Sequence, residues 1–187
     1  FLQNPWKFTY KPKAINTKKQ PSESDWLQSF KLIHPSIKSI EMFWSVKNNI
    51  IEWSKLHHGS TYAFFKNNIN PSWEDDMNRE GCSYMFYFNQ NRITEQDLDD
   101  VFESALLFLI GEWSIYSQFI NGITFERKMR GDKMIVWCNS HSKEMLINVK
   151  KLNNKGYDVA IDILGEHVKT EQEATEITER YANLYDR

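Results

Sequence analysis

Apolar residues recur with the spacing of a helix in three stretches of the chain, and a capping box at Thr170–Glu173 predicts a fourth helix. In the first stretch, Ile40, Phe43 and Trp44 fall on one face, as in an amphipathic helix. The second opens with the approximate capping box Thr94–Asp97 and ends at Gly111, a residue typical of helix stops. Similar patterns follow nearer the C-terminus. The predicted helices span residues 39–50, 94–110, 142–153 and 171–185.

Strand signals are interspersed with these helices. Trp6, Phe8 and Tyr10 alternate with polar residues, as in an edge strand, and the stretch 26–32 has the pattern of a strand end. The turn signal at 130–132 joins two further strands in a hairpin. Because hairpin turns dominate the order of elements, the pattern predicts an α+β fold with an antiparallel sheet. The other predicted strands span residues 60–66, 83–89, 123–129, 133–138 and 158–164.

Length and loop composition indicate how the chain is organised. A polar stretch punctuated by prolines, residues 11–25, predicts a surface loop. The chain has no internal repeats, and 187 residues suffice for one domain with a sizeable core. We therefore expect a single domain over residues 1–187, with a C-terminal helix within 170–187. No apolar run approaches the roughly 20 residues needed to span a bilayer, so no membrane association is expected.

Charge and cysteine content exclude several classes of protein. The net charge of −2 argues against a protein that coats nucleic acid through its phosphates, although it leaves room for a nucleotide at one site. Two cysteines, Cys82 and Cys138, are too few for a disulfide scaffold or a four-cysteine zinc site, and they fit a reducing compartment. Neither a metal nor a cofactor is expected.

The segment Pro71-Ser72-Trp73-Glu74 carries the strongest chemical signal. A large ring lies directly beside a carboxylate in a loop, which suits a planar cationic heterocycle that needs a stacking surface and a hydrogen-bond acceptor. Trp26 borders the polar stretch 11–25 and is the candidate second ring. The alternative is structural, because a loop tryptophan often packs at the edge of a core.

A second signal is the basic hairpin at residues 127–133. Arg127, Lys128, Arg130 and Lys133 place four cations within seven residues around one turn. Together they suit a short run of phosphates, whereas for any one of them a solvated turn is the simpler interpretation. Strand alternation makes Lys128 point away from Arg127, so these two are not expected to share a ligand.

Several enzyme classes lack their motifs in this chain. There is no glycine-rich phosphate loop and no Gly-x-Ser-x-Gly nucleophile elbow. His57-His58 has no metal-ligand partner at a suitable spacing, so a surface turn with Gly59 is expected. The glutamates near the C-terminus recur at helical spacing, which is typical of a solvated face. We therefore expect that the protein is not an enzyme.

Five groups of motifs share their order and spacing with one known family. They are Leu2-Gln3-Asn4-Pro5-Trp6; Phe43-Trp44; Tyr62-Ala63-Phe64-Phe65-Lys66 with Asn70-Pro71-Ser72-Trp73-Glu74-Asp75; Asp97-Leu98-Asp99 with Leu106-Leu107-Phe108-Leu109-Ile110-Gly111-Glu112; and Gly131-Asp132-Lys133-Met134-Ile135-Val136-Trp137. With these motifs the chain resembles the messenger-RNA cap-binding translation initiation factor 4E family over almost its full length. The resemblance implies a curved, mostly antiparallel sheet of about eight strands with three helices on its convex face.

The same resemblance implies that the concave face binds 7-methylguanosine, the cap of messenger RNA. Trp26 and Trp73 correspond to the two stacking rings, and Glu74 to the carboxylate that reads the N1 and N2 donors of guanine. Trp137 corresponds to the residue that meets the N7-methyl group. Methylation at N7 makes the base cationic and strengthens its stacking on indoles, so such a slot would discriminate methylated from plain guanine.

The phosphate end of the site departs from the family pattern. Lys128 and Lys133 match positions that hold the cap phosphates, with Lys128 where arginine is usual. Ser83 stands where the family often has an arginine that contacts phosphate. Arg79 and Arg130 are the candidates to replace it.

The resemblance also implies a partner-binding surface on the convex face, for a Tyr-x-x-x-x-Leu helix of the scaffold subunit or of inhibitory proteins. Trp44 is the central residue, although its pattern with Ile40 and Phe43 also fits a core stripe. Glu103 and Ser104 stand where a leucine and a glutamate are typical. The matching positions are Pro5, Ile40, Trp44, Leu107 and Gly111.

Core positions show replacements as well. Tyr84 and Phe102 stand where the family has tryptophan, and we interpret both as conservative core changes. Thr9 also stands at such a position, and this replacement is not conservative.

The leading hypothesis is a cytoplasmic protein, with the nucleus as a second location, that binds capped messenger RNA and recruits the initiation machinery. The alternative within the family is a homologue that represses or stores messages because it recruits partners differently. A cap-processing hydrolase would need a catalytic acid cluster that the sequence lacks. A carbohydrate-binding module is disfavoured because sugars gain nothing from the basic hairpin.

Overall fold

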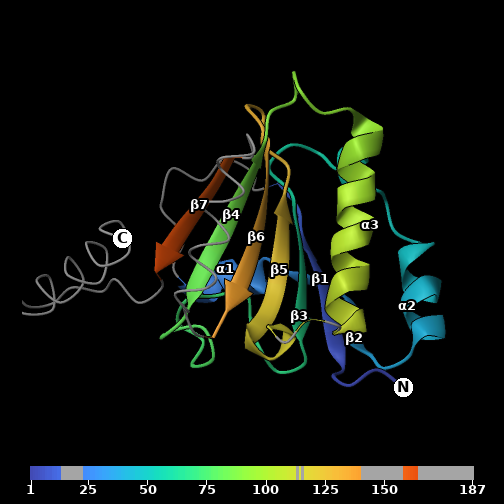
Figure 1. Cartoon of the computed structure of the whole chain (residues 1–187), viewed down its shortest axis with the longest axis vertical. Helices are drawn as coiled ribbons and strands as arrows, with labels where there is room; N and C mark the ends of the chain where they lie inside the picture. Colours follow the sequence, from blue (N-terminus) through green and yellow to red (C-terminus); the bar gives the residue numbers. More distant parts are fainter. Residues whose placement is uncertain (14–22, 113, 115, 140–157, 164–187) are drawn as a thin grey trace, which may run out of the picture.

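A computed structural model describes residues 1–13, 23–112, 114, 116–139 and 158–163 (Figure 1). In this part of the chain, seven antiparallel strands form one sheet in the order β2-β1-β3-β5-β6-β4-β7. The predicted α+β class with a curved antiparallel sheet is confirmed. The strands are β1 (Trp6–Lys11), β2 (Lys31–Ile37), β3 (Thr61–Lys66), β4 (Cys82–Phe88), β5 (Ile120–Glu126), β6 (Asp132–Cys138) and β7 (Asp158–Ile163).

Two of the predicted helices cover one face of the sheet, which we call the helix face. Phe43 of α2 packs against Phe64 of β3, and Phe102 of α3 packs against Tyr62 of β3 and Phe125 of β5. A third, shorter helix, α1, lies behind the sheet in Figure 1. The helices are α1 (Glu23–Gln28), α2 (Ile40–Lys47) and α3 (Glu95–Gly111), and two 3₁₀ turns span Trp53–Lys55 and Ser117–Phe119.

Helix α3 forms as its sequence predicts. The Thr94 hydroxyl accepts a hydrogen bond from the Asp97 amide, and the Asp97 carboxylate accepts one in return from the Thr94 amide, which completes the capping box. The predicted stop is displaced by one residue. Gly111 remains helical, and Glu112 takes the left-handed conformation with φ of 47°.

Aromatic side chains fill the core between the helices and the sheet. The ring of Phe102 is stacked on Tyr62 at 5.7 Å and meets Phe125 edge-on at 4.7 Å, while Trp6 is stacked on Phe64 at 5.0 Å. Such pairs stabilise a core beyond the area that they bury. Tyr84 and Phe102 are both buried here, which agrees with their interpretation as core replacements.

Strand alternation separates this core from a smaller cluster on the opposite face. Phe64 enters the core, whereas its neighbours Ala63 and Phe65 point the other way. Phe30 and Trp137 pack against this smaller cluster. The opposite face therefore carries its own aromatic group, which the helices α2 and α3 do not cover.

Two predictions about the first strands are wrong. β1 is not at the edge of the sheet, because β2 pairs with its outer side. Pro35 lies in β2, and proline is tolerated there because an edge strand leaves some amides without a ladder partner. The stretch 26–32 is not a strand end either. Its first half belongs to α1, and β2 begins only at Lys31.

Other predictions fall partly or wholly outside the described residues. The helices 142–153 and 171–185 cannot be compared with the structure, and neither can residues 14–22 of the predicted loop 11–25. At its ends that loop differs from the prediction, since Lys11 belongs to β1 and residues 23–25 to α1. His57 and His58 lie exposed in a turn with Gly59, as predicted.

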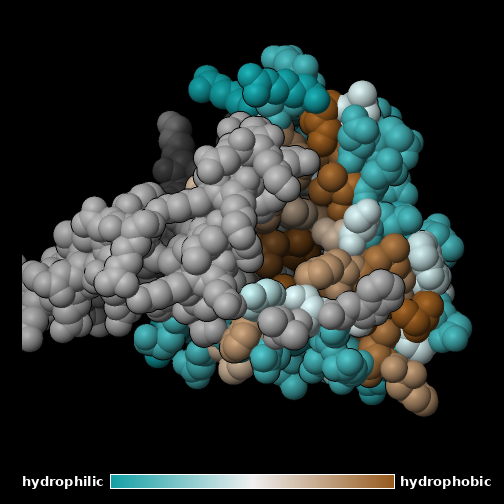
Figure 2. All heavy atoms as spheres, viewed as in Figure 1, coloured by the Kyte–Doolittle hydropathy of each residue, from teal (hydrophilic) through white to brown (hydrophobic). Residues whose placement is uncertain are grey.

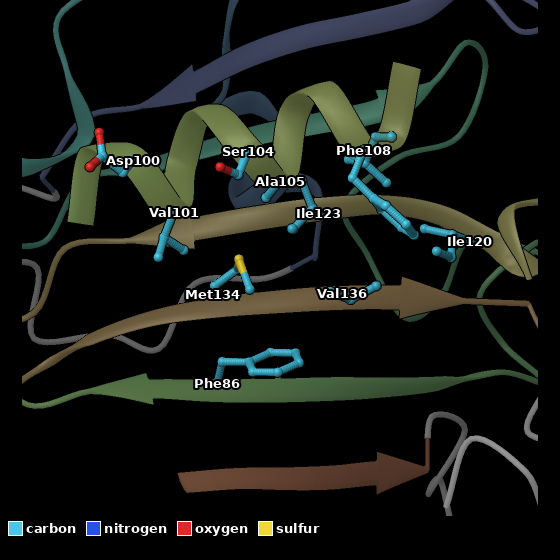
Figure 3. A pocket seen from close by; sticks show the side chains of 11 residues that line it. Phe86, Asp100, Val101, Ser104, Ala105, Phe108, Ile120, Ile123, Met134 and Val136 are labelled. Atoms are coloured by element: carbon cyan, nitrogen blue, oxygen red, sulfur yellow. The ribbon is translucent and has the colours of Figure 1, made fainter. Parts of the chain in front are cut away.

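An apolar groove of about 600 Å³ separates part of α3 from the sheet. Figure 2 shows apolar residues gathered beside α3 on this side of the molecule. In Figure 3, Val101 of α3 points toward Met134 of β6, and the ring of Phe108 lies beside Ile120 of β5. Apart from Asp100 and Ser104, the residues that line the groove are apolar.

We expect Phe102→Ala to lower the free energy of unfolding by about 3–5 kcal/mol, because it removes a fully buried ring at the centre of the core. Phe108→Ala is the matched control on the same helix, since that ring is 47% exposed, and its cost should stay within about 1 kcal/mol. Urea denaturation followed by circular dichroism measures both. Equal costs would contradict this description of the core.

Candidate functional site

The loop after β3, residues 70–79, carries Trp73 and Glu74 and is held by a buried amide. The side-chain nitrogen of Asn78 donates to the carbonyl oxygens of Asn70 at 2.9 Å and Ser72 at 2.7 Å. Its side-chain oxygen accepts from Asn121 of β5 at 2.9 Å. Both ends of the Asn78 side chain are therefore used, and the loop is fixed to the sheet.

Asp75 adds a second set of bonds within the loop. Its carboxylate accepts from the amides of Asn70 at 2.8 Å and Met77 at 3.1 Å. Lys7 of β1 donates to the side chain of Asn70 at 3.0 Å. Burial lowers the pKa of Lys7, and the nearby Asp75 carboxylate opposes that shift. The loop thus has partners on two strands and within itself.

Trp26 of α1 is connected directly to this loop. Its indole nitrogen donates to the carbonyl oxygen of Pro71 at 3.1 Å, two residues before Trp73. Trp26 also meets Phe30 edge-on at 5.5 Å, and Phe30 packs against the smaller cluster on the opposite face. The structure therefore brings together Trp26 and the Trp73 loop, the two segments that the sequence proposed as a pair.

A lysine of the chain already lies over the Trp26 ring. The Lys11 ammonium is 4.2 Å from the ring centroid, a distance typical of a cation–π contact. Burial lowers the pKa of Lys11, while the Glu126 carboxylate raises it. The ring is thus accessible to a cation in this fold. Lys11 was not predicted, although it alternates with Tyr10 and so must face away from the core.

Glu74 and Arg79 are engaged within the loop. The Ser72 hydroxyl hydrogen-bonds the Glu74 carboxylate and accepts from the Glu74 amide at 3.2 Å. Arg79 donates to the Glu74 carbonyl oxygen at 3.2 Å and pairs with Asp76 at 3.1 Å. Glu74 is half-buried and its orientation is supported by Ser72, whereas the Arg79 guanidinium points toward its own loop.

Trp137 of β6 lies on the same face as Phe30. Its indole nitrogen donates to the Thr124 hydroxyl at 3.4 Å, and its ring meets Phe65 at 5.9 Å. Gly122 lies between Phe65 and Trp137 in the strand register. A side chain there would come within 2.3 Å of the Phe65 ring, so this position requires glycine. No local sequence pattern marks Gly122, because the need for glycine arises from Phe65 on the neighbouring strand β3.

The basic hairpin divides into two parts, as strand alternation predicted for Lys128 and Arg127. Arg127 and Asp132 form a buried ion pair, and Asp132 also accepts from the Lys128 amide at 3.0 Å. Burial raises the pKa of Asp132 against the influence of these donors. Arg127 is thus structural. Lys128 instead pairs with Glu126 at 2.9 Å and remains exposed.

The other residues considered for the phosphate end of the site lie in different surroundings. The Lys133 ammonium lies 5.0 Å from the centroid of the Tyr87 ring. Arg130 is exposed at the hairpin tip. Ser83 is buried opposite Trp137 in the strand register, so this part of the sheet receives no cation from position 83.

On the helix face, the predicted partner surface is partly exposed. Ile40 is 46% and Leu107 37% exposed, and Trp44 is half-buried against Phe43 at 5.2 Å. The backbone carbonyl of Pro5 accepts from the Asn67 amide, and Gly111 is half-buried at the end of α3. These positions come from the N-terminal segment, α2 and α3.

An unpredicted charge cluster lies beside this surface. The Lys47 side chain is only 5% exposed and pairs with Glu52 at 2.9 Å and Glu103 at 3.4 Å. Lys47 falls on the same helical face as Phe43, where an apolar residue would be expected. Glu103, which departs from the family pattern, is therefore the partner of a buried cation and connects α2 to α3.

Among the residues that the structure describes, no group of three or more His, Cys, Asp or Glu side chains could hold a metal ion. None of their helices combines the length and apolarity required to cross a lipid bilayer.

Helices on one face of a single antiparallel sheet, and aromatic and cationic side chains on the other, define a single-sheet α+β protein with an aromatic face suited to a flat ligand. Comparison with known proteins makes the assignment specific. The chain belongs to the eukaryotic initiation factor 4E family, whose model matches residues 1–177.

Individual relatives agree with this assignment. Eukaryotic translation initiation factor 4E of Aplysia californica is 32% identical over 143 residues, which cover 76% of this chain and 62% of that protein. The human factor is 32% identical over 73% of this chain and 59% of its own length. The chain thus spans about 60% of the length of these relatives. The solved structure of Ascaris suum eIF4E-3 with an m2,2,7G cap has a TM-score of 0.73 and 27% identity, with 91% of this chain and 92% of that chain covered.

We expect Asn78→Ala to lower the free energy of unfolding by about 1–3 kcal/mol, because it leaves buried carbonyl groups of the loop without a donor. Asn49→Ala is the matched control, since its one side-chain bond, to the Ser45 carbonyl, is exposed. Thermal unfolding of both variants is the measurement. If Asn78→Ala cost no more than the control, the loop would not depend on this amide.

Proposed function

We propose that the protein binds the 7-methylguanosine cap of messenger RNA and recruits the translation initiation machinery. The observation that carries the proposal is the hydrogen bond from Trp26 to the Pro71 carbonyl, at 3.1 Å. This bond holds α1 against the loop that presents Trp73 and Glu74. It supports an aromatic slot in which a base would be stacked by Trp26 and Trp73.

The chemistry of the slot matches a methylated guanine. A positively charged base gains cation–π energy on indole rings, and the Trp26 ring already accommodates the Lys11 ammonium at 4.2 Å. Glu74 would accept from the N1 and N2 donors of guanine, a charge-assisted pair, and Trp137 would meet the methyl group. Solved structures of Ascaris suum eIF4E-3 contain an m2,2,7G cap and an m7G cap, which supports the same ligand class for this chain.

The cap phosphates would lie toward the basic hairpin. Lys133 and Lys128 supply cations on the slot side, and Arg130 supplies one at the hairpin tip. Arg79 is the least favourably oriented of the candidates, because its guanidinium already pairs with Asp76.

The helix face would receive a protein partner through Trp44, Ile40 and Leu107. A solved structure of C. elegans eIF4E-3, 26% identical to this chain, is a complex with the 4E-binding protein Mextli and a cap analogue. This supports a protein partner for this chain, and the family resemblance implies that the partner carries a Tyr-x-x-x-x-Leu helix. The relatives are named as initiation factors, which favours recruitment over message storage. A cytoplasmic location, with the nucleus as a second compartment, follows from this role.

Tryptophan fluorescence quenching tests cap binding. We expect 7-methyl-GTP to bind at least about tenfold more tightly than GTP, and Glu74→Gln to weaken 7-methyl-GTP about tenfold or more, because a charge-assisted acceptor is lost. Trp44→Ala, on the opposite face, is the control and should leave cap affinity unchanged. Equal affinities for 7-methyl-GTP and GTP would refute the proposal.

Partner binding is tested separately with an immobilised Tyr-x-x-x-x-Leu peptide. We expect Trp44→Ala to weaken capture about tenfold or more, because a central aromatic anchor is removed from the surface. Trp73→Ala serves as the control and should retain the peptide. Retention of the peptide by Trp44→Ala at wild-type affinity would place the partner elsewhere.

A further inference from the structure

Tyr87 of β4 is an aromatic residue on the same face of the sheet as Trp137. In the pairing of β4 with β6, Tyr87 lies opposite Lys133, and Ser83 lies opposite Trp137. Directly opposed residues point to the same face, and every second residue along a strand does so too. Tyr87, Lys133 and Trp137 therefore share one surface.

The ring of Tyr87 is accessible and lies beside a cation. The residue is 40% exposed, unlike the buried aromatic residues of the core. Its hydroxyl lies 3.7 Å from the Met85 sulfur, and the Lys133 ammonium lies 5.0 Å from the ring centroid. An exposed ring beside a cation is the combination that proteins use to hold a base and its adjoining phosphate.

The spacing of Trp137, Lys133 and Tyr87 on this face is the second feature. Lys133 precedes Trp137 by four residues on β6, a distance of about 13 Å at the rise of an antiparallel strand. Tyr87 lies one strand further, about 5 Å from β6. The order across this face is thus slot, cation, ring. A triphosphate bridge that joins two nucleosides spans a distance of this order.

We propose that Tyr87 is a stacking surface for the base of the nucleotide that follows the triphosphate bridge of the cap, with Lys133 bound to the bridge between the two bases. This inference rests on the proposed function, because the slot must hold the first base. The Tyr87 ring can stack on any base, since each base has a flat π face.

The two aromatic sites favour bases of different charge. The slot of Trp26 and Trp73 favours a cationic base. Tyr87 already lies beside the Lys133 ammonium, so it favours a neutral base and disfavours a second positive charge. An ordinary nucleotide of the message meets that requirement.

The test compares 7-methyl-GTP with the dinucleotide caps m7GpppA and m7GpppU by fluorescence quenching, for the wild type, Tyr87→Leu and Tyr87→Phe. The measured quantity is the affinity ratio of each dinucleotide to 7-methyl-GTP, because comparing this ratio between variants cancels the difference in phosphate charge. We expect Tyr87→Leu to lower the ratio about fivefold or more, and Tyr87→Phe to keep it, since the ring is retained. Affinity for 7-methyl-GTP should change less than the ratio.

The outcomes distinguish the two proposals. If 7-methyl-GTP fails to bind the wild type, the proposed function is wrong. If 7-methyl-GTP binds but Tyr87→Leu leaves the ratio unchanged, only the role of Tyr87 is wrong. A second measurement uses the wild-type chain alone: a capped RNA with 4-thiouridine as its first transcribed nucleotide should crosslink to Tyr87 on irradiation. A crosslink located elsewhere by mass spectrometry would overturn the inference.

Discussion

Side chains that follow one another in a strand point to opposite faces of a sheet, and this constraint organises the molecule. Phe64 enters the aromatic core under α2 and α3, while Phe65, the next residue, supports the group around Trp137. One sheet therefore serves as the floor of the core and as the floor of the candidate site. A shift of one residue in the pairing of β3 would exchange the two, so the core and the site share a single register.

The site is built by connections between elements that are distant in sequence. Trp26 and Pro71 are joined by one hydrogen bond, and Asn78 is joined to Asn121 by another. Each bond restricts the motion of the loop or short helix that it joins. A slot held in this way loses less conformational entropy when a ligand enters it, which is the usual advantage of preorganisation.

Much of the fold could be predicted from local signals, because those elements form from their own residues. The capping box of α3 and the hairpin around Gly131 are examples. The six-residue helix α1 could not be predicted, since so short a helix depends on tertiary contacts such as that of Trp26. In the candidate site, residue type and family resemblance predicted Trp73, Glu74 and Trp137. Asn78 and Gly122 were missed because their importance arises from neighbours on other strands.

The buried ammonium of Lys47 has a consequence for how this surface can change over generations. Its carboxylate partners are Glu52, just before the 3₁₀ turn that follows α2, and Glu103, in the middle of α3. A leucine at position 103 alone would leave the buried cation with Glu52 as its remaining carboxylate partner, at a cost in stability. A leucine at 103 together with an uncharged residue at 47 would avoid that cost. Positions 47 and 103 are therefore expected to vary as a pair. A change in the composition of the docking surface would then accompany a change in the contact between α2 and α3.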